Sequence, residues 1–172
     1  MNPNPFCWPF RAQYLAGGAT CVALLAYAFF EQFQMGVEPC PLCIFQRLAF
    51  IVMALFFFIA AMHGPRSGGR RVYASLVAAA AAVGAGIAAY HLRVQQLGPD
   101  PTAGCTPGWN YMIENYSFRY AWAKTVQNAF TGHADCADIN WSFLGLSMPG
   151  WTLICFVLLG AGALWAGFRR RA

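Results

Sequence analysis

Four long runs of apolar residues, separated by polar segments, dominate the pattern along the chain. They cover residues 14–33, 44–62, 72–90 and 151–168. A hydrocarbon core about 30 Å thick requires about 20 apolar residues in a helix, so each run is long enough to cross a bilayer. The pattern therefore predicts an all-α membrane protein, in which residues 1–172 form a single integral membrane domain with a bundle of four transmembrane helices.

The polar segments place two loops on one side of this bundle, a short one over residues 34–43 and a long one over residues 91–148. Residues 108–130 of the long loop are rich in aromatic side chains, which favour the headgroup layer. We expect a short helix lying in the membrane interface there, with a loop packed on itself as the alternative. Pro149 and Gly150 are expected to break any helix before the last span.

Arginine placement predicts the orientation of the bundle. The composition is 59% hydrophobic and only 10% charged, and the arginines gather at residue 11, in the link 66–71 and at 169–171. Because cytoplasmic flanks collect Lys and Arg, both termini are expected in the cytoplasm and the two loops in the periplasm. The net charge of +5 then reflects topology, and no nucleic-acid partner is expected. A cleaved signal peptide ending near Ala28 is the alternative for the first run, which is long for such a segment.

The seven cysteines divide according to the predicted spans. Four fall on the periplasmic side, where an oxidising compartment favours disulfides: Cys40, Cys43, Cys105 and Cys136. Whether the pair Cys105 and Cys136 is structural or carries electrons is left open by spacing alone. Of the others, Cys7 is expected to be idle, and Cys21 and Cys155 to be small packing residues inside spans.

The segment CPLC opens the second span and combines two chemical features. Cys40 suits an N-cap and Pro41 the first helical position, where its missing N–H costs nothing. The positive end of the helix dipole favours thiolate at both sulfurs. Arg47 follows Cys43 by four residues, so both lie on one helix face, and an ionisable residue in an apolar run indicates a functional site. Snorkelling of Arg47 to the headgroups is the alternative.

A dithiol at the edge of a membrane is suited to a lipid-soluble electron acceptor such as quinone. Arg47 is then expected to hold a quinone carbonyl and to stabilise the negative charge that develops there. Zinc is the competing chemistry, but Cys105 and Cys136 are 31 positions apart and form no second short pair. We therefore expect no metal site, although His91 or His133 would complete a mixed ligand set. A non-catalytic four-span scaffold with structural disulfides is a further alternative.

Three motifs together resemble the DsbB family of bacterial quinone-linked thiol oxidases. They are CPLCIFQR, the pair Cys105 and Cys136 in the second loop, and WSFLGLSMPGW before the last span. The resemblance implies a protein of the bacterial inner membrane that reoxidises a periplasmic thioredoxin-fold partner similar to DsbA. It also implies that ubiquinone or menaquinone accepts the electrons.

The resemblance further assigns roles to individual residues. Cys105 would be attacked by the thiolate of the reduced partner, and Cys136, once released, would attack Cys40 and expel Cys43. Cys43 would face the quinone, which Arg47 and His91 would help to bind. Each exchange between sulfurs would pass through a mixed disulfide.

Overall fold

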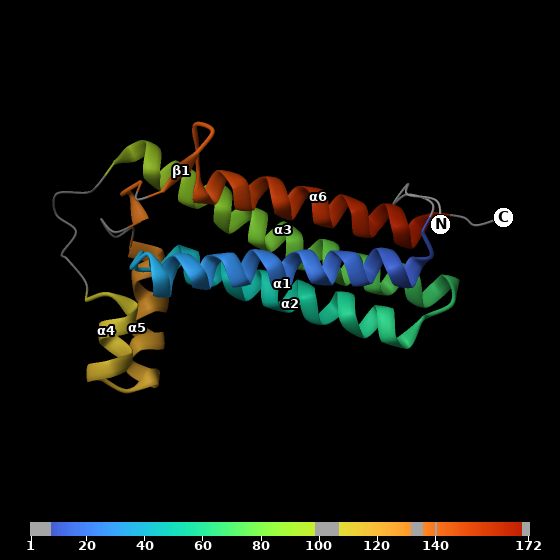
Figure 1. The fold of residues 1–172 in the computed structure, drawn as a ribbon, viewed down its shortest axis with the longest axis horizontal. Helices are drawn as coiled ribbons and strands as arrows, with labels where there is room; N and C mark the ends of the chain where they lie inside the picture. The colour runs from blue at the N-terminus through green and yellow to red at the C-terminus, as the bar shows by residue number, and fades with distance from the viewer. Residues whose placement is uncertain (1–7, 99–106, 132–135, 140, 170–172) are drawn as a thin grey trace.

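Four long helices form an elongated bundle, and two short helices lie across one of its ends (Figure 1). The computed structural model describes residues 8–98, 107–131, 136–139 and 141–169. Each long helix is long and apolar enough to cross a membrane, so the predicted four-helix membrane bundle is confirmed. The elements are α1 Phe10–Gln34, α2 Pro41–His63, α3 Ser67–Leu97, α4 Trp109–Asn115, α5 Phe118–Thr131, β1 Ser142–Phe143, β2 Leu146–Ser147 and α6 Met148–Phe168.

Helix α2 begins as its sequence predicts. Cys40 is the N-cap in an extended conformation, and Pro41 takes the first helical position. The Cys40 sulfur accepts a hydrogen bond from the backbone N–H of Cys43 at 3.4 Å, so it satisfies one of the donors that every helix start leaves open. The helix ends at Gly64, whose left-handed conformation (φ 57°) suits a residue without a Cβ.

The start of α6 differs from the prediction. The helix begins at Met148 and includes Pro149 and Gly150, so the expectation that these two residues break it was wrong. Proline is tolerated because the first turn of a helix has no partner for its N–H groups. A two-residue turn at Leu144 and Gly145, both with positive φ, folds the preceding strands β1 and β2 into a small antiparallel hairpin.

Helix α3 is also longer than the apolar run that predicted it. It continues beyond Tyr90 for about two turns and ends at Leu97. Residues 91–97, expected in the long loop, therefore extend the rigid bundle. The extension holds His91 on a helix, with its side chain only 2% exposed.

Small residues allow close packing between α3 and α6. A Cβ added to Gly84 of α3 would lie 2.5 Å from the ring of Phe156, and one added to Gly160 of α6 would lie 2.9 Å from Ala81. Phe156 in turn stacks on Phe50 of α2, with ring centroids 4.1 Å apart. Close helix approach of this kind is the main source of packing energy inside a bilayer.

The start of α1 and the link between α2 and α3 lie at the end of the bundle opposite to α4 and α5 (Figure 1). Arginine side chains join the helix ends there. Arg11 donates from Nε to the carbonyl of Ala61 at 2.8 Å, which joins α1 to α2. The guanidinium of Arg70 lies over the Phe10 ring, 5.1 Å from its centroid. Arg11 and Arg70 thus lie together at one end of the helices, as the sequence pattern predicts.

The two short helices are attached to the other end by polar contacts. The Glu38 carboxylate accepts a hydrogen bond from the backbone N–H of Asn110 at 3.5 Å, near the start of α4. Gln32 of α1 donates to the side chain of Asn110 at 2.8 Å. Trp122 of α5 packs against Phe45 of α2, with ring centroids 5.7 Å apart. The single short helix expected in this loop is therefore a pair of helices.

Candidate redox site

The two sulfurs of CPLC lie side by side at the start of α2. Cys40 Sγ is 2.9 Å from Cys43 Sγ, within hydrogen-bonding distance of two thiols. Cys40 is the N-cap and Cys43 lies in the first turn, so one helical turn brings the two side chains together. The pair is thus placed by the local geometry of one helix end.

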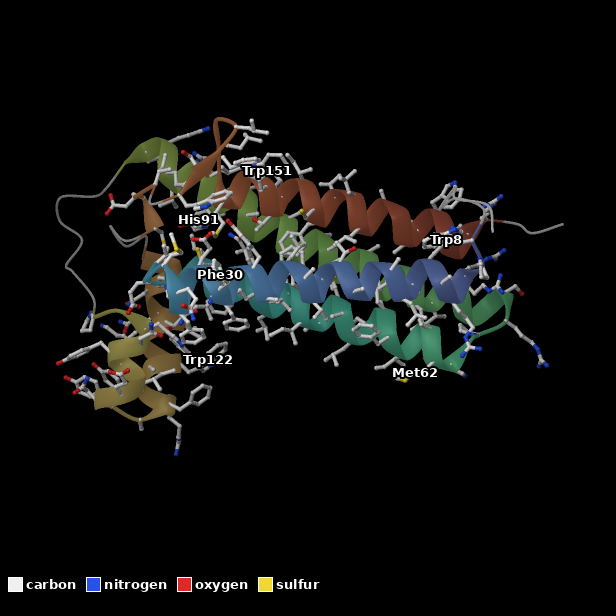
Figure 2. All side chains as sticks on the ribbon, viewed as in Figure 1. Trp8, Phe30, Met62, His91, Trp122 and Trp151 are labelled. Atoms are coloured by element: carbon white, nitrogen blue, oxygen red, sulfur yellow. The ribbon has the colours of Figure 1, made fainter. Side chains whose placement is uncertain are left out.

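Cys136 and His91 complete a buried cluster around Cys40. His91 Nε2 is 3.7 Å from Cys40 Sγ and 3.1 Å from the carbonyl oxygen of Cys136. The Cys40 sulfur, the Cys136 sulfur and a ring nitrogen of His91 all lie within 4.8 Å of one another. Figure 2 shows His91 at the end of the bundle that carries α4 and α5, far from Trp8 and Met62. Residues far apart in sequence therefore meet at one point.

The acidity of Cys40 departs from the sequence-based expectation. Hydrogen bonding to Cys136, then hydrogen bonding to Cys43 and burial, raise the pKa of the Cys40 thiol well above its usual range. Enclosure of Cys40 by the sulfurs of Cys43 and Cys136 thus acts against the helix dipole. In this arrangement Cys40 favours the protonated thiol and not the thiolate that its helix end predicts.

A chain of buried polar groups links His91 to the last helix. Thr152 of α6 donates to Gln46 Oε1 at 2.6 Å, and Gln46 Nε2 lies 3.1 Å from His91 Nδ1. With the Gln46 amide in this orientation, His91 Nδ1 accepts and Nε2 carries the proton that it donates to Cys136. Gln46 is 4% exposed, so its hydrogen bonds determine how the imidazole is oriented.

Arg47 lies one turn beyond Cys43 and is held by α1. It donates from Nη1 to Gln32 Oε1 and from Nη2 to the carbonyl of Ala28, the latter at 3.0 Å. The guanidinium also lies 5.2 Å from the centroid of the Phe29 ring. These contacts keep the cation inside the bundle, which argues against simple snorkelling to the headgroups.

An apolar cavity of about 360 Å³ opens between α1, α2 and α6. Cys43, Arg47, Gln46 and Thr152 supply its few polar atoms, and its remaining walls are Leu24, Leu25, Tyr27, Ala28, Phe50, Trp141, Phe143, Met148, Trp151 and Cys155. Cavities of this size and lining bind small, largely apolar ligands whose orientation is fixed by a few polar groups. The arrangement suits a flat, lipid-soluble ring with carbonyl groups.

A second cavity, of about 280 Å³, reaches the other sulfur of the pair. Cys40 lines it together with Glu38, Asp138 and Asn128. Asn128 is 2% exposed, and its Nδ2 atom has no hydrogen-bond partner among the described residues. The CPLC pair therefore stands between an apolar cavity beside Cys43 and a polar one beside Cys40.

Most residues predicted for the site converge in the structure. Cys40, Cys43 and Cys136 meet, Arg47 lines the apolar cavity together with Cys43, and His91 lies beside Cys40. The residues that line this cavity do not include His91, which reaches it only through Gln46. Cys105 and His133 lie outside the described residues.

Sequence reasoning missed three polar residues of the site: Gln32, Gln46 and Thr152. The signal that could have found them is the presence of an amide or hydroxyl side chain near the end of an apolar run. Such groups are costly in hydrocarbon unless they have partners. Cys155, interpreted as a packing residue, lines the apolar cavity.

Comparison with known proteins identifies one family. The family described as "Disulfide bond formation protein DsbB" matches residues 10–166. A disulfide bond formation protein B of Xanthomonas euvesicatoria pv. vesicatoria (strain 85-10) is 49% identical over 169 residues, 98% of this chain and 96% of the relative. Proteins of the same name from Methylococcus capsulatus (Bath) and Nitrosococcus oceani (C-107) are 46% and 40% identical. Each of these two alignments covers 90% of this chain, with 92% and 89% of the relative.

Proposed function

Because the chain belongs to the DsbB family of disulfide bond formation proteins, we propose that it oxidises a periplasmic dithiol protein and transfers the electrons to a membrane quinone. The electron donor would be a thioredoxin-fold protein similar to DsbA. The observation that carries the proposal is the position of the CPLC pair. Cys43 shares an apolar cavity with Arg47, while Cys40 faces Cys136 on the other side.

The apolar cavity fits a quinone head group. Its volume of about 360 Å³ and its mainly apolar walls suit the ring, and Arg47 offers N–H groups for a ring carbonyl. A bound quinone supplies an acceptor for two electrons and two protons. Arg47 would stabilise negative charge at a carbonyl oxygen, since its guanidinium is already held in place by Gln32 and Ala28. Ubiquinone and menaquinone both meet these requirements.

Thiol–disulfide exchange would bring electrons to this cavity. The reduced partner's thiolate attacks Cys105 in a Cys105–Cys136 disulfide, which forms a mixed disulfide and releases Cys136 as a thiolate. Cys136 attacks Cys40 in the Cys40–Cys43 disulfide and expels Cys43 as a thiolate. The proximity of Cys136 and Cys40, whose sulfurs lie within 4.8 Å, supports this step.

The cycle requires no reactant besides the partner and the quinone, which would accept the two electrons. The partner's second thiol attacks the mixed disulfide, so the oxidised partner leaves and Cys105 is released. Cys105 then attacks Cys136 and frees Cys40. The Cys40–Cys43 dithiol loses two electrons and returns to the disulfide. The two protons lost by the partner's thiols balance the two required by the acceptor.

His91 would act on Cys40 and Cys136 and not as a direct wall of the quinone cavity. Its Nε2 atom lies near both residues, and Gln46 holds the ring from the other side. We propose that Nε2–H donates a hydrogen bond to the Cys40 sulfur, 3.7 Å away, whenever that sulfur is a thiolate. Gln46 and Thr152 would keep the imidazole ring oriented toward the two sulfurs.

The protein would lie in the bacterial inner membrane with its redox end in the periplasm. Clustering of Arg11, Arg70 and Arg71 at the opposite end supports this orientation, since basic residues are retained on the cytoplasmic side. Both termini would then be cytoplasmic.

The test is quinone-dependent oxidation of a reduced DsbA-like protein by the purified chain in lipid nanodiscs. Loss of partner thiols and loss of quinone absorbance are recorded together, for the wild type and for Cys43→Ser. We expect Cys43→Ser to abolish quinone reduction and to retain a mixed disulfide with a partner that lacks its resolving cysteine.

The matched control is Cys21→Ser, which removes a buried thiol of α1 and is expected to leave the rate unchanged. Retention of the wild-type quinone reduction rate by Cys43→Ser would refute the proposed electron path.

A further inference from the structure

We propose that Cys40, Cys136 and His91 form a binding site for Zn²⁺ that exists only when the cysteines are reduced. Three ligand atoms from α2, α3 and the segment after α5 meet in a buried cluster, all within 4.8 Å of one another. The inference goes beyond the proposed function. It rests on that function only in requiring that both sulfurs pass through a thiol state.

The distances match those of a tetrahedral zinc site. Zn–S bonds of about 2.3 Å and Zn–N bonds of about 2.0–2.1 Å, at the tetrahedral angle, place sulfur and nitrogen about 3.6 Å apart. Cys40 Sγ and His91 Nε2 are 3.7 Å apart. The metal would bind between these atoms, with the Cys136 carbonyl, now 3.1 Å from Nε2, turned away from the ring. Water would take the fourth position, as in open zinc sites.

The charge and softness of the donors favour zinc over other divalent cations. Two thiolates and a neutral imidazole exactly balance a dication, so the occupied site carries no net charge in its buried setting. Thiolate and imidazole are ligands that Zn²⁺ prefers, whereas Mg²⁺ and Ca²⁺ prefer oxygen. The ligand residues Cys40, His91 and Cys136 are 9%, 2% and 2% exposed, so little water competes for the metal.

Gln46 and Thr152 supply the support that zinc-binding histidines require. A metal on Nε2 needs the proton on Nδ1, and Nδ1–H must then donate to an oxygen. The Gln46 amide can present Oε1 to Nδ1 by turning over, because Thr152 Oγ1 also lies 3.0 Å from the carbonyl of Pro149. Thr152 then donates to Pro149 and accepts from the Gln46 amide. Gln46 and Thr152 thus keep hydrogen-bond partners in either orientation of the amide.

Binding would be gated by the redox state of the sulfurs. Zn²⁺ displaces one proton from each of the two thiols and changes no oxidation state, so it requires no other reactant. A disulfide sulfur offers no thiolate, so the oxidised protein cannot form this site. A metal on Cys40 would also prevent the attack of Cys136 and the return of the Cys40–Cys43 disulfide. Zn²⁺ would therefore hold the oxidase in its reduced form.

The first experiment measures metal binding without partner or quinone. Cys7, Cys21, Cys105 and Cys155 are replaced by serine, so that Cys40, Cys43 and Cys136 are the remaining thiols. This protein is reduced with a phosphine, freed of reductant under argon, and titrated with Zn²⁺ against a chromophoric chelator. We expect one tightly bound Zn²⁺ per chain after reduction and none after oxidation. Absence of stoichiometric binding by the reduced protein, or equal binding by the oxidised protein, would overturn the proposal.

Variants then identify the ligands. His91→Ala and Cys136→Ser should each lower the affinity more than the roughly 10–100-fold expected for Gln46→Leu, which removes an outer support. His63→Ala is the matched control, because His63 lies at the other end of α2 and pairs with Tyr73. An affinity that His91→Ala leaves unchanged would overturn the assignment.

A further measurement uses the protein in which all three proposed ligands are intact, so its result does not depend on whether the variants fold. X-ray absorption of the zinc-loaded protein should show both sulfur and imidazole nitrogen in the first coordination shell. A shell of oxygen alone, or of sulfur without nitrogen, would contradict the site. Because none of these experiments includes partner or quinone, their failure would leave the proposed oxidase activity untouched.

Discussion

Replacement of Arg47 by methionine tests how the bundle positions a cation beside Cys43. Methionine keeps an unbranched apolar side chain but removes the bonds to Gln32 and to the Ala28 carbonyl. Loss of the donor leaves the buried Gln32 oxygen without a partner at a cost of about 1–3 kcal/mol in stability. Loss of a preorganised donor to a developing oxyanion typically costs about 10²–10³ in rate, or about 2.7–4 kcal/mol. We therefore expect Arg47→Met to fold and to reduce quinone at least about 100-fold more slowly.

Arg47→Lys separates charge from geometry. Lysine keeps the positive charge but cannot reproduce both guanidinium contacts, so its rate should lie between those of Met and Arg. The assay is kcat/KM for quinone in nanodiscs, with trapping of the mixed disulfide as a second readout. Trapping should be unchanged in both variants, since that exchange occurs before electrons reach the cavity. A quinone kcat/KM within about twofold of wild type for Arg47→Met would refute this reasoning.

Three further predictions follow from packing and from the cavity. Gly84→Ala should lower the free energy of unfolding by about 1–3 kcal/mol, because its Cβ would meet the Phe156 ring. Gly86→Ala, in open space, should change this free energy by less than about 0.5 kcal/mol. Equal denaturation midpoints of the two variants would contradict this prediction. Gln46→Leu should slow the exchange between Cys136 and Cys40, measured by rapid acid quench, with quinone KM less affected than kcat. Cys155→Phe should fill the apolar cavity and raise the quinone KM, whereas Cys155→Ser should not.

Local chemistry made the helices and the start of α2 predictable. The four spans follow from run length alone, since a bilayer requires helices of about this length. The N-cap at Cys40 and the first-turn Pro41 depend only on neighbouring residues, and the structure has both. The prediction for Pro149 failed because a proline in the loop before a span and a proline in the first turn of that span look alike in sequence.

The extra length of α3 was not predictable from hydropathy. Residues 91–97 are mostly polar, so a search for apolar runs ends at Tyr90 although the backbone remains helical to Leu97. The length of an apolar run indicates how much of a helix lies in the bilayer. Polar residues with high helix propensity can extend the helix beyond that run. His91 therefore belongs to a rigid helix.

The convergence of Cys136, His91 and Cys40 depends on how helices rotate and pack against one another. Sequence spacing places Cys40 beside Cys43 but carries no information on which residue of α3 faces them. The spacing argument against zinc has the same basis, because spacing along the chain does not show that Cys40, His91 and Cys136 lie close together. Gln46 has no charged residue four positions away in the sequence that would indicate a partner. Its role became interpretable only through its contacts with His91 and Thr152.

The central claim is that electrons leave the protein through the apolar cavity beside Cys43, and photoaffinity labelling tests it most directly. A quinone bearing a photoreactive group is bound to the protein in nanodiscs, and the labelled peptides are identified by mass spectrometry. We predict labels in residues 24–28, 43–50 and 151–155, and their loss when excess unlabelled quinone is present. Labels confined to a different apolar cavity, about 240 Å³ and lined by Tyr14, Phe57 and Leu159, would contradict the account.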